Sequence, residues 1–406
     1  MGRTDLKTVF VHILGGFLAM VIACMPLGAG AAAGEPLKIG AILPFTGEFA
    51  PEGATALAGA RARLKEVNAE GGIRGRMLEL VVKDNESDNE VGARLVDEMA
   101  DAGVLAVVGP ITSGMAFALK PVAARRKLPF VATNATHNDL TSADSWMFRS
   151  IFPNYFQATV LASFIRHDLG IERVAIVFDQ RRPYSVDLAS QFRADYERLG
   201  GTVVCDTSYT VGIYDEPEVF KTELARIVDT LVAAKPEMVF APTYFEEAAP
   251  LIRVAGAAGL EARFAAPDSW NNEIVYQSAG NNLKNCFVAG SFSLDDPDPA
   301  ISRFLQLMEK NDAEHVDGGT ALGYDAMSMI VEAIRTSGVT GEAIRRGLLN
   351  LKDFPLVTGR ITITPKGESE KDVGIFEVKR SDDGQFRAQM VTRTRPGKNG
   401  PPETAP

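Results

Sequence analysis

The chain has few of the residues that build metal centres and disulfide scaffolds. Its 406 residues include 3 cysteines and 4 histidines. Three cysteines cannot form a disulfide framework, and no two histidines stand at the spacing of metal ligands. We therefore expect no metal and no cofactor. Two of the cysteines, Cys205 and Cys286, have the option of pairing with each other, but two buried thiols are the simpler expectation.

The chain also lacks any block of basic residues. Its 42 Lys+Arg against 52 Asp+Glu give a formal net charge of −10, which argues against a nucleic-acid partner. Beyond the N-terminus, no segment approaches the run of about 20 apolar residues that a membrane span needs. A hydrophobic fraction of 46% is that of a globular chain, and the length predicts two or more domains.

The N-terminal residues have the three parts of a secretory signal peptide. Arg3 and Lys7 precede an apolar stretch at 9–22, and small residues follow at 28–34. This order of charged, apolar and small residues predicts a signal peptide over residues 1–33 and hence an exported protein. Two exits remain open. We favour cleavage in the small-residue run, and the alternative is a lipoprotein-like box that ends at Cys24.

Short apolar strands alternate with helices along most of the chain. Strands are predicted at 38–43, 78–82, 104–108 and 128–131, and the same rhythm restarts after Pro153. Apolar strands separated by helices predict parallel sheets that are covered on both faces. We therefore expect an α/β protein with two doubly wound units. The Pro- and Gly-rich tail over 395–406 is predicted to be disordered.

The turns after the strands are the candidate binding positions, because open α/β sheets bind ligands beyond the carboxyl ends of their strands. No turn has the glycine spacing of a dinucleotide or phosphate loop. Ser113 opens a predicted helix, where a hydroxyl and free backbone N–H groups form an anion cradle or where the serine is a simple N-cap. Ile111 replaces the first glycine of a nucleophile elbow, so we expect no enzyme.

Two further turns carry polar residues. Asn134, Ala135 and Thr136 follow the strand at 128–131, and Asp268 follows a strand at 263–265. An acid in that position is either a helix cap or the counter-charge for a bound ammonium group. The residue types at these turns therefore suit a small polar ligand.

Several motifs, taken in their order and spacing, resemble one family. They are Ile39-Gly40, Pro44-Phe45-Thr46-Gly47, the run 68–75, Asp84, Gly109-Pro110 with Ser113-Gly114, Phe148-Arg149, Gly200-Gly201 and Tyr324-Asp325-Ala326. From about Leu37 to about Val391, the chain is similar to the leucine/isoleucine/valine-binding proteins. These are the periplasmic substrate-binding components of ABC importers.

The resemblance implies the type I periplasmic binding fold, in which three crossover strands join two lobes and the ligand is enclosed between them. Lobe one would comprise 35–153 plus 287–355, and lobe two 154–286 plus 356–394. The implied protein is a periplasmic monomer that binds an amino acid or analogue and delivers it to an ABC permease and ATPase complex. The alternative function is a ligand-sensing receptor of the same fold that docks onto a separate signalling protein.

Site residues can be carried over one by one. The resemblance implies that Ser113 and Thr136 hold the ligand carboxylate through their hydroxyls. Asn134 matches a position that binds through its backbone, and Ala135 lies between them in the same ligand-binding turn. Asp268 matches the acid that pairs with the ligand ammonium, where the valine-binding proteins typically have Glu.

The same resemblance implies an aromatic cover for the ligand. Tyr184 matches the lobe-two aromatic that closes over it, and either Tyr244 or Phe245 matches a second one. Glu52 stands where branched-chain binders usually present an aromatic beside the ligand side chain, and we include it in the ligand-binding set as a departure from the family.

Charged residues near these positions bear on the choice of ligand. We predict that Glu52, Arg181 and Arg182 are solvated surface charges. If any of them faces the ligand, the ligand carries a polar or charged side chain. We therefore expect a polar or general amino acid at least as readily as leucine.

Overall fold

The computed structural model describes residues 34–283, 286–313 and 315–396. The predicted signal peptide over 1–33, with Cys24, lies outside the described residues. So does the predicted tail, apart from residues 395 and 396. These assignments therefore stay predictions.

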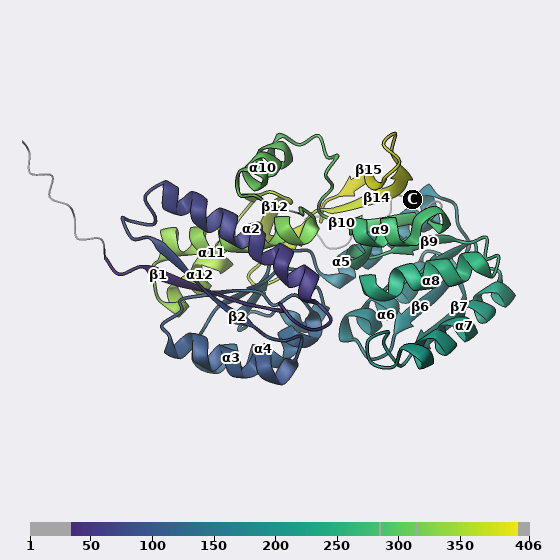
Figure 1. Ribbon diagram of the computed structural model, residues 1–406, viewed down its shortest axis with the longest axis horizontal. Coiled ribbons are helices and arrows are strands. Elements are labelled where there is room, and N and C mark those ends of the chain that lie inside the picture. Colours follow the sequence, from purple (N-terminus) through teal and green to yellow (C-terminus); the bar gives the residue numbers. More distant parts are fainter. Residues whose placement is uncertain (1–33, 284–285, 314, 397–406) are drawn as a thin grey trace, which may run out of the picture. The chain divides into compact units, whose positions relative to one another are not determined.

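The first sheet has five parallel strands in the order β2-β1-β3-β4-β5. Its strands are β1 (Leu37–Leu43), β2 (Leu78–Asp84), β3 (Val107–Val108), β4 (Phe130–Ala132) and β5 (Met147–Arg149). Helices cover both faces (Figure 1), namely α3 (Asn89–Asp101) and α4 (Ser113–Arg126) on one side, and α2 (Ala50–Ala69), α11 (Gly318–Ser337) and α12 (Gly341–Leu349) on the other. This is the predicted doubly wound arrangement, and it brings the C-terminal helices back onto the first sheet.

The second sheet has seven strands in the order β15-β14-β10-β9-β8-β6-β7. They are β6 (Arg173–Asp179), β7 (Thr202–Tyr209), β8 (Met238–Phe240), β9 (Arg263–Ala266), β10 (Cys286–Gly290), β14 (Val373–Arg380) and β15 (Phe386–Thr394). One face packs on α5 (Asn154–Ser163), the π-helical turn η2 (Phe164–Asp168) and α6 (Pro183–Arg198), and the other on α7 (Pro217–Ala234), α8 (Phe245–Ala257) and α9 (Glu273–Ala279). This sheet is not wholly parallel, because β14 pairs antiparallel with both β10 and β15. A short loop joins β14 to β15, and a hairpin of this kind pairs only in that direction.

A small antiparallel sheet completes the described strands. It consists of β11 (Phe354–Leu356), β12 (Gly359–Ile363) and β13 (Ser369–Lys371). The remaining helices are α10 (Pro299–Lys310) and the 3-10 turns η1 (Asn138–Leu140), η3 (Asp268–Trp270) and η4 (Gly280–Asn282). Ile361 and Ile363 pack into the core of the first sheet, whereas residues 286–290 belong to the second. The exact lobe limits stay a prediction.

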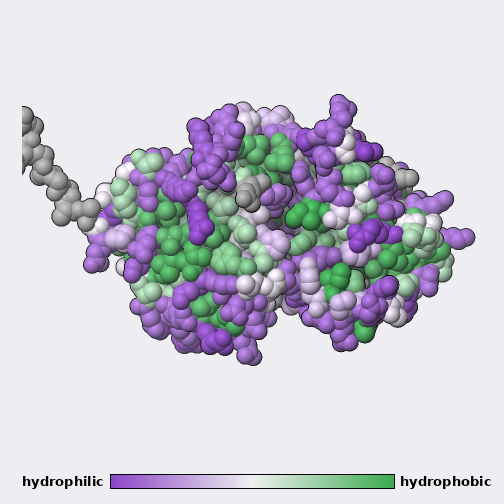
Figure 2. Space-filling view, in the orientation of Figure 1, coloured by the Kyte–Doolittle hydropathy of each residue, from purple (hydrophilic) through white to green (hydrophobic). Residues whose placement is uncertain are grey.

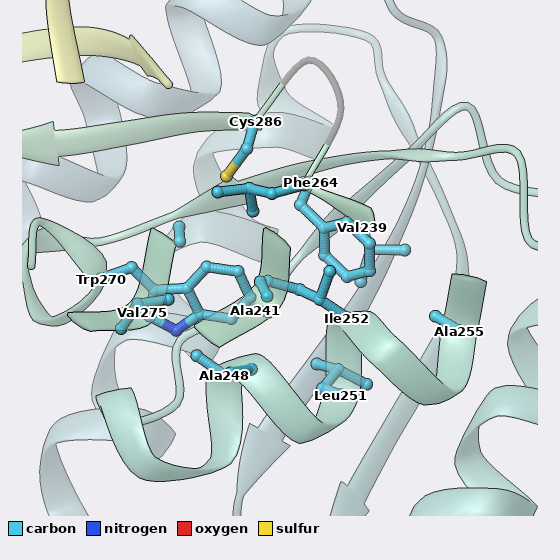
Figure 3. Close-up of a cluster of buried hydrophobic side chains, with 14 of the residues drawn as sticks. Val239, Ala241, Ala248, Leu251, Ile252, Ala255, Phe264, Trp270, Val275 and Cys286 are labelled. Atoms are coloured by element: carbon cyan, nitrogen blue, oxygen red, sulfur yellow. The ribbon is translucent and has the colours of Figure 1, made fainter. Parts of the chain in front are cut away.

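A hydrophobic core under α8 and α9 fixes the loop that follows β9 (Figure 3). Trp270 is fully buried in it, and its indole N–H donates to the Thr243 hydroxyl over 3.1 Å. Cys286 lies in the same core, and the half-buried Cys205 packs against it. Both are free thiols, as predicted. Because Trp270 anchors η3, the first residue of that turn, Asp268, has a defined position.

A buried ion pair lies where the chain passes between the two sheets. Lys371 and Asp325 are 1% and 0% exposed, and their Nζ and Oδ2 atoms are 3.5 Å apart. The ammonium also donates to the carbonyl of Ser150 at 2.5 Å and to the Thr358 hydroxyl. The carboxylate accepts from the Val357 and Thr358 N–H groups and from the Thr358 hydroxyl. The network therefore ties α11 to the ends of β5 and β13.

None of the helices in the described residues is long and apolar enough to cross a membrane. On the face shown in Figure 2, hydrophobic residues are interspersed with hydrophilic ones.

Asp325→Asn should lower the free energy of unfolding by about 3–5 kcal/mol, because it leaves the Lys371 ammonium buried without a counter-charge. Lys371→Met should cost less, since Asp325 keeps its three remaining donors. Urea unfolding measures both. Asp101→Asn removes an exposed partner of Arg126 and is the matched control, with an expected loss of about 0–1 kcal/mol. An Asp325→Asn loss as small as that of the control would contradict this assignment.

Candidate functional site

The start of α4 supplies one side of the site. Thr112 caps the helix, since its hydroxyl accepts the Met115 N–H over 3.2 Å. The N-cap alternative for Ser113 is therefore wrong. Ser113 is the first helical residue, is 1% exposed, and accepts the His137 N–H at 3.3 Å. This bond brings the helix start to the turn after β4, as the prediction for Ser113 and Thr136 requires.

The turn after β4 presents polar atoms with no partner of their own. Thr136 is fully buried, and its Oγ1 has no hydrogen bond within the described residues. The same holds for Asn134 Oδ1 and for Oγ1 of Thr133, a residue that sequence reasoning missed. Ala135 differs, because its side chain packs into the core beside α4. An unpaired buried oxygen costs about 1–3 kcal/mol, so these atoms are suited to a ligand's hydrogen bonds.

A buried arginine holds this turn in shape. Arg149, at the end of β5, is fully buried and donates from Nη1 to the carbonyls of Thr136 and His137 over 2.7 and 3.1 Å. Its Nη2 donates to the Thr141 hydroxyl over 3.1 Å. Because both carbonyls are already occupied, the Thr136 hydroxyl and neighbouring backbone groups keep one orientation.

Asp268 faces the site from the second sheet. Its Oδ1 accepts from Gln157 Nε2 and from the Tyr184 hydroxyl, each over 2.8 Å. Its own N–H donates to Gln157 Oε1 at 3.1 Å. Burial raises the pKa of Asp268 to about 6, although the two side-chain hydrogen bonds lower it. The side chain makes no helix-capping bond, so the cap interpretation is wrong.

Aromatic rings line the space next to Asp268. Tyr184 stacks on Tyr244 with ring centroids 5.1 Å apart and planes 12° apart. Tyr244 in turn meets the edge of Phe49 at 5.1 Å. Of the two alternatives for the second aromatic, Tyr244 lies with Tyr184, whereas Phe245 packs against the core of α7 to α9. Phe49 was not foreseen.

The first and second sheets contribute to a common pocket of about 60 Å³. It is lined by Asn134 from the turn after β4, by Asp268 from the turn after β9, and by Asp317 and Gly319 at the start of α11. Asn134 and Asp268 therefore share one pocket, and Tyr184 joins it through its bond to Asp268. Within the stretches that the structure describes, no three His, Cys, Asp or Glu side chains gather as a metal site.

Glu52 is not a surface charge, contrary to our prediction. Both of its carboxylate oxygens are shielded from solvent, and neither has a hydrogen-bond partner in another described residue. Burial, followed by the charges of Asp317 and Glu48, raises the pKa of Glu52 to about 8. Asp317 also lines the pocket described above. The effect of its charge on the pKa of Glu52 indicates that Glu52 lies near this pocket.

The two arginines are also engaged rather than solvated. Arg182 Nη2 donates to both carboxylate oxygens of Glu48, over 2.6 Å to Oε1. Its guanidinium lies over the rings of Phe49 and Tyr244, at 5.4 and 5.8 Å from their centroids. Since Glu48 follows β1 and Arg182 follows β6, this ion pair joins the two sheets. Arg181 forms ion pairs with Asp179, the last residue of β6, and with Asp215.

Sequence reasoning missed Gln157 and the acidic pair Glu246 and Glu247. Gln157 was detectable as a polar residue in an otherwise apolar helix. Glu246 and Glu247 follow β8, so the rule that pointed to Asp268 would also have pointed to them. Only the structure shows whether the carboxylates of Glu246 and Glu247 have hydrogen-bond partners.

Comparisons with known proteins agree with this geometry. A family model described as periplasmic binding protein matches residues 36–385. Leu/Ile/Val-binding protein homolog 3 of Brucella melitensis is 25% identical over 91% of this chain and 98% of its own length.

Two solved structures are also similar to this chain. The branched-chain amino acid transporter substrate binding protein of Streptococcus pneumoniae, in complex with isoleucine, is 25% identical over 88% of this chain and 99% of that one, with a TM-score of 0.78. An ABC-transporter solute binding protein of Rhodopseudomonas palustris, in complex with 3,4-dihydroxybenzoic acid, is 19% identical over 89% of this chain and 97% of that one, with a TM-score of 0.79.

Asp268 should make the ligand-free protein less stable as the pH rises. Its pKa of about 6 lies above the ordinary value of about 4, so the folded state holds this proton more tightly than the unfolded state does. Stability from this group is present below about pH 4 and is lost as the pH rises to about 6. Asp268→Asn keeps an oxygen that can accept from Gln157 and Tyr184 but removes the charge.

Urea unfolding at several pH values tests this. Relative to the wild type, the free energy of unfolding of Asp268→Asn should rise by about 3 kcal/mol between pH 4 and pH 7. Other titrating groups cancel in the difference between the two proteins. A difference that does not change with pH, or that changes in the opposite direction, would contradict the assigned environment of Asp268.

Proposed function

The chain belongs to the periplasmic binding protein family, and we propose that it is the substrate-binding protein of an ABC importer, with an amino acid or a close relative as its ligand. Its relative in Brucella melitensis is named as a Leu/Ile/Val-binding protein homolog, and its structural neighbour from Streptococcus pneumoniae as a transporter substrate binding protein. These names support import over the sensing alternative. Periplasmic location fits the family, while the signal peptide, lipid anchoring, permease and monomeric state belong to the proposal.

One observation carries the ligand class. The half-buried carboxylate of Asp268 lines the same pocket as Asn134, in the turn whose Thr136 hydroxyl lacks a partner. A dipolar amino-acid head needs both of its charges satisfied when it leaves water. An acid suits the ammonium, and hydroxyls next to the N-terminus of α4 suit the carboxylate.

Two hydrogen bonds orient the carboxylate of Asp268. Gln157 and Tyr184 both donate to Oδ1, so the carboxylate is held in one orientation relative to the pocket. A ligand ammonium beside it makes a charge-assisted bond that contributes about 1.5–3 kcal/mol. It also removes the cost of a buried charge without a counter-ion. This makes an ammonium-bearing ligand a better fit than a simple carboxylic acid, such as the one in the Rhodopseudomonas palustris neighbour.

The ion pair between Arg182 and Glu48 supports a closing movement. It links the turn after β1 to the turn after β6, with Phe49 and Tyr244 packed around the guanidinium. A ligand that contacts residues of both sheets favours the closed arrangement by its higher affinity for that state. A permease would then distinguish loaded from empty protein.

Binding of α-amino acids should require both Asp268 and Thr136. In thermal-shift and calorimetric titrations, we expect at least one α-amino acid to raise the melting temperature by mass action. Asp268→Asn should weaken its binding by about 100-fold or more, and Thr136→Val by about tenfold. The first variant should nevertheless be at least as stable as the wild type at pH 8, which separates lost binding from lost folding.

Two controls complete this experiment. Glu90→Gln changes an exposed acid in the first turn of α3 and should leave affinity unchanged. The deaminated analogue of the best ligand, and 3,4-dihydroxybenzoate, should bind poorly to the wild type. Unchanged affinity in Asp268→Asn, or equal binding of the deaminated analogue, would refute the proposed function.

A further inference from the structure

We propose that the ligand is a basic α-amino acid, whose terminal ammonium or guanidinium group is bound by Glu52 and Glu246 in a buried acidic subsite. The acidic subsite comprises Glu52 in the first turn of α2 and Glu246 and Glu247 in the first turn of α8. This inference rests on the proposed function and names the chemical class of its ligand.

The carboxylates of the acidic subsite are buried and make no hydrogen bond to another residue. All six of their oxygens are shielded from solvent, and none accepts a hydrogen bond from another residue within the described part of the chain, although each carboxylate interacts with its own backbone N–H. Glu247 is 1% exposed as a whole residue. Such groups cost free energy unless a cation or a set of donors reaches them. Their oxygens therefore have the hydrogen-bonding capacity that a cationic group needs.

The nearby arginines are already used by other acids. Arg182 donates to Glu48, and Arg181 pairs with Asp179 and Asp215. Arg181 comes only within 3.9 Å of Glu247 and makes no hydrogen bond to it.

Glu52 and Glu246 have no cation at all within 4 Å, as far as the described residues go. The two glutamates that lack a cation lie on helices that cover different sheets, Glu52 on α2 and Glu246 on α8.

The contact between Phe49 and Tyr244 brings the starts of α2 and α8 together, and the electrostatic effects of the carboxylates on one another agree with this. Burial, followed by the charge of Glu52, raises the pKa of Glu246 to about 11. Burial and then the charges of Glu246, Glu247, Glu48 and Glu52 raise the pKa of the exposed Tyr214. A cationic ligand group would reverse this repulsion, since an opposite charge at short range favours the ionised carboxylate.

Helix stabilisation does not explain the arrangement. Acids in the first turn of a helix interact favourably with the helix dipole, and Glu90 in α3 is an example. Glu90, however, is exposed. Burial of Glu52 and Glu246 without a cation adds a desolvation cost that the helices do not need. The buried position therefore points to a bound group rather than to the helices.

Aromatic rings in mutual contact lie between Asp268 and the acidic subsite. Asp268 bonds to Tyr184, which stacks on Tyr244, and Tyr244 contacts Phe49. Glu246 follows Tyr244 by two residues, and Glu52 follows Phe49 by three. The aliphatic stem of a lysine or arginine can pack along these rings while its charged end reaches the carboxylates. The side chain of leucine can also pack on these rings, but it has no cationic group to bind Glu52 and Glu246.

Calorimetric titration of matched ligand pairs tests the inference on the wild-type protein. L-lysine is compared with L-norleucine, and L-arginine with L-citrulline, so that each pair differs in the charge of the terminal group. At least one basic member should bind about tenfold or more tightly than its neutral match, as expected for charge-assisted bonds. The Glu52→Gln/Glu246→Gln double variant should reduce that preference to about threefold or less. Glu90→Gln should retain it.

The possible outcomes separate the two levels of the proposal. If norleucine or leucine binds as tightly as lysine and arginine, and binding still depends on Asp268, the acidic subsite is overturned while the proposed function stands. A basic preference that persists in the double variant overturns the assignment to Glu52 and Glu246. If no α-amino acid binds, both levels fail. Should the double variant not fold, the single variants Glu52→Gln and Glu246→Gln take its place.

Discussion

The structure depends on the rule that a carboxylate removed from water must be paired, hydrogen-bonded or neutralised. Asp325 satisfies it through Lys371, and Glu48 through Arg182. Asp268 satisfies it in part, through two donors to one oxygen. Glu52 and Glu246 satisfy it only by neutralisation, since burial raises their pKa values to about 8 and about 11 and their oxygens have no partner in another described residue. The incompletely satisfied acids lie where the two sheets face each other, which is where a ligand would contact both.

Buried side chains with hydrogen-bond partners hold the scaffold in place, whereas buried side chains with unpaired oxygens belong to the proposed site. Arg149 and Trp270 are fully buried and fix the turns that carry Thr136 and Asp268. Rigid turns of this kind allow a small dipolar ligand to be recognised without rearrangement of the binding residues. In a closing movement, the ion pair of Arg182 with Glu48 lies between the two sheets, whereas the buried network of Lys371 holds the connecting segments together.

Much of the fold could be predicted from the sequence because it rests on local patterns. Helix α4 begins at Ser113, as predicted, and β1 and β2 lie at the strands predicted over 38–43 and 78–82. The antiparallel pairing of β14 with β15 and the sheet of β11 to β13 were not predicted, because apolar periodicity does not determine strand direction or partner. The resemblance assigned Ser113 and Thr136 to one ligand carboxylate, and the structure places Ser113 in contact with His137, the residue after Thr136. Glu52 was wrongly predicted to be exposed, because an acidic residue in a helix start has the same sequence pattern whether it faces water or another lobe.

The most direct test of the central claim is a crystal structure of the wild-type protein with its ligand bound. The account predicts the ligand ammonium within about 2.7–3.2 Å of the Asp268 carboxylate, at ordinary hydrogen-bond distance. It also predicts the ligand carboxylate on the hydroxyls of Ser113 and Thr136. A ligand bound elsewhere, or one that turns a carboxylate or an apolar group toward Asp268, would contradict it.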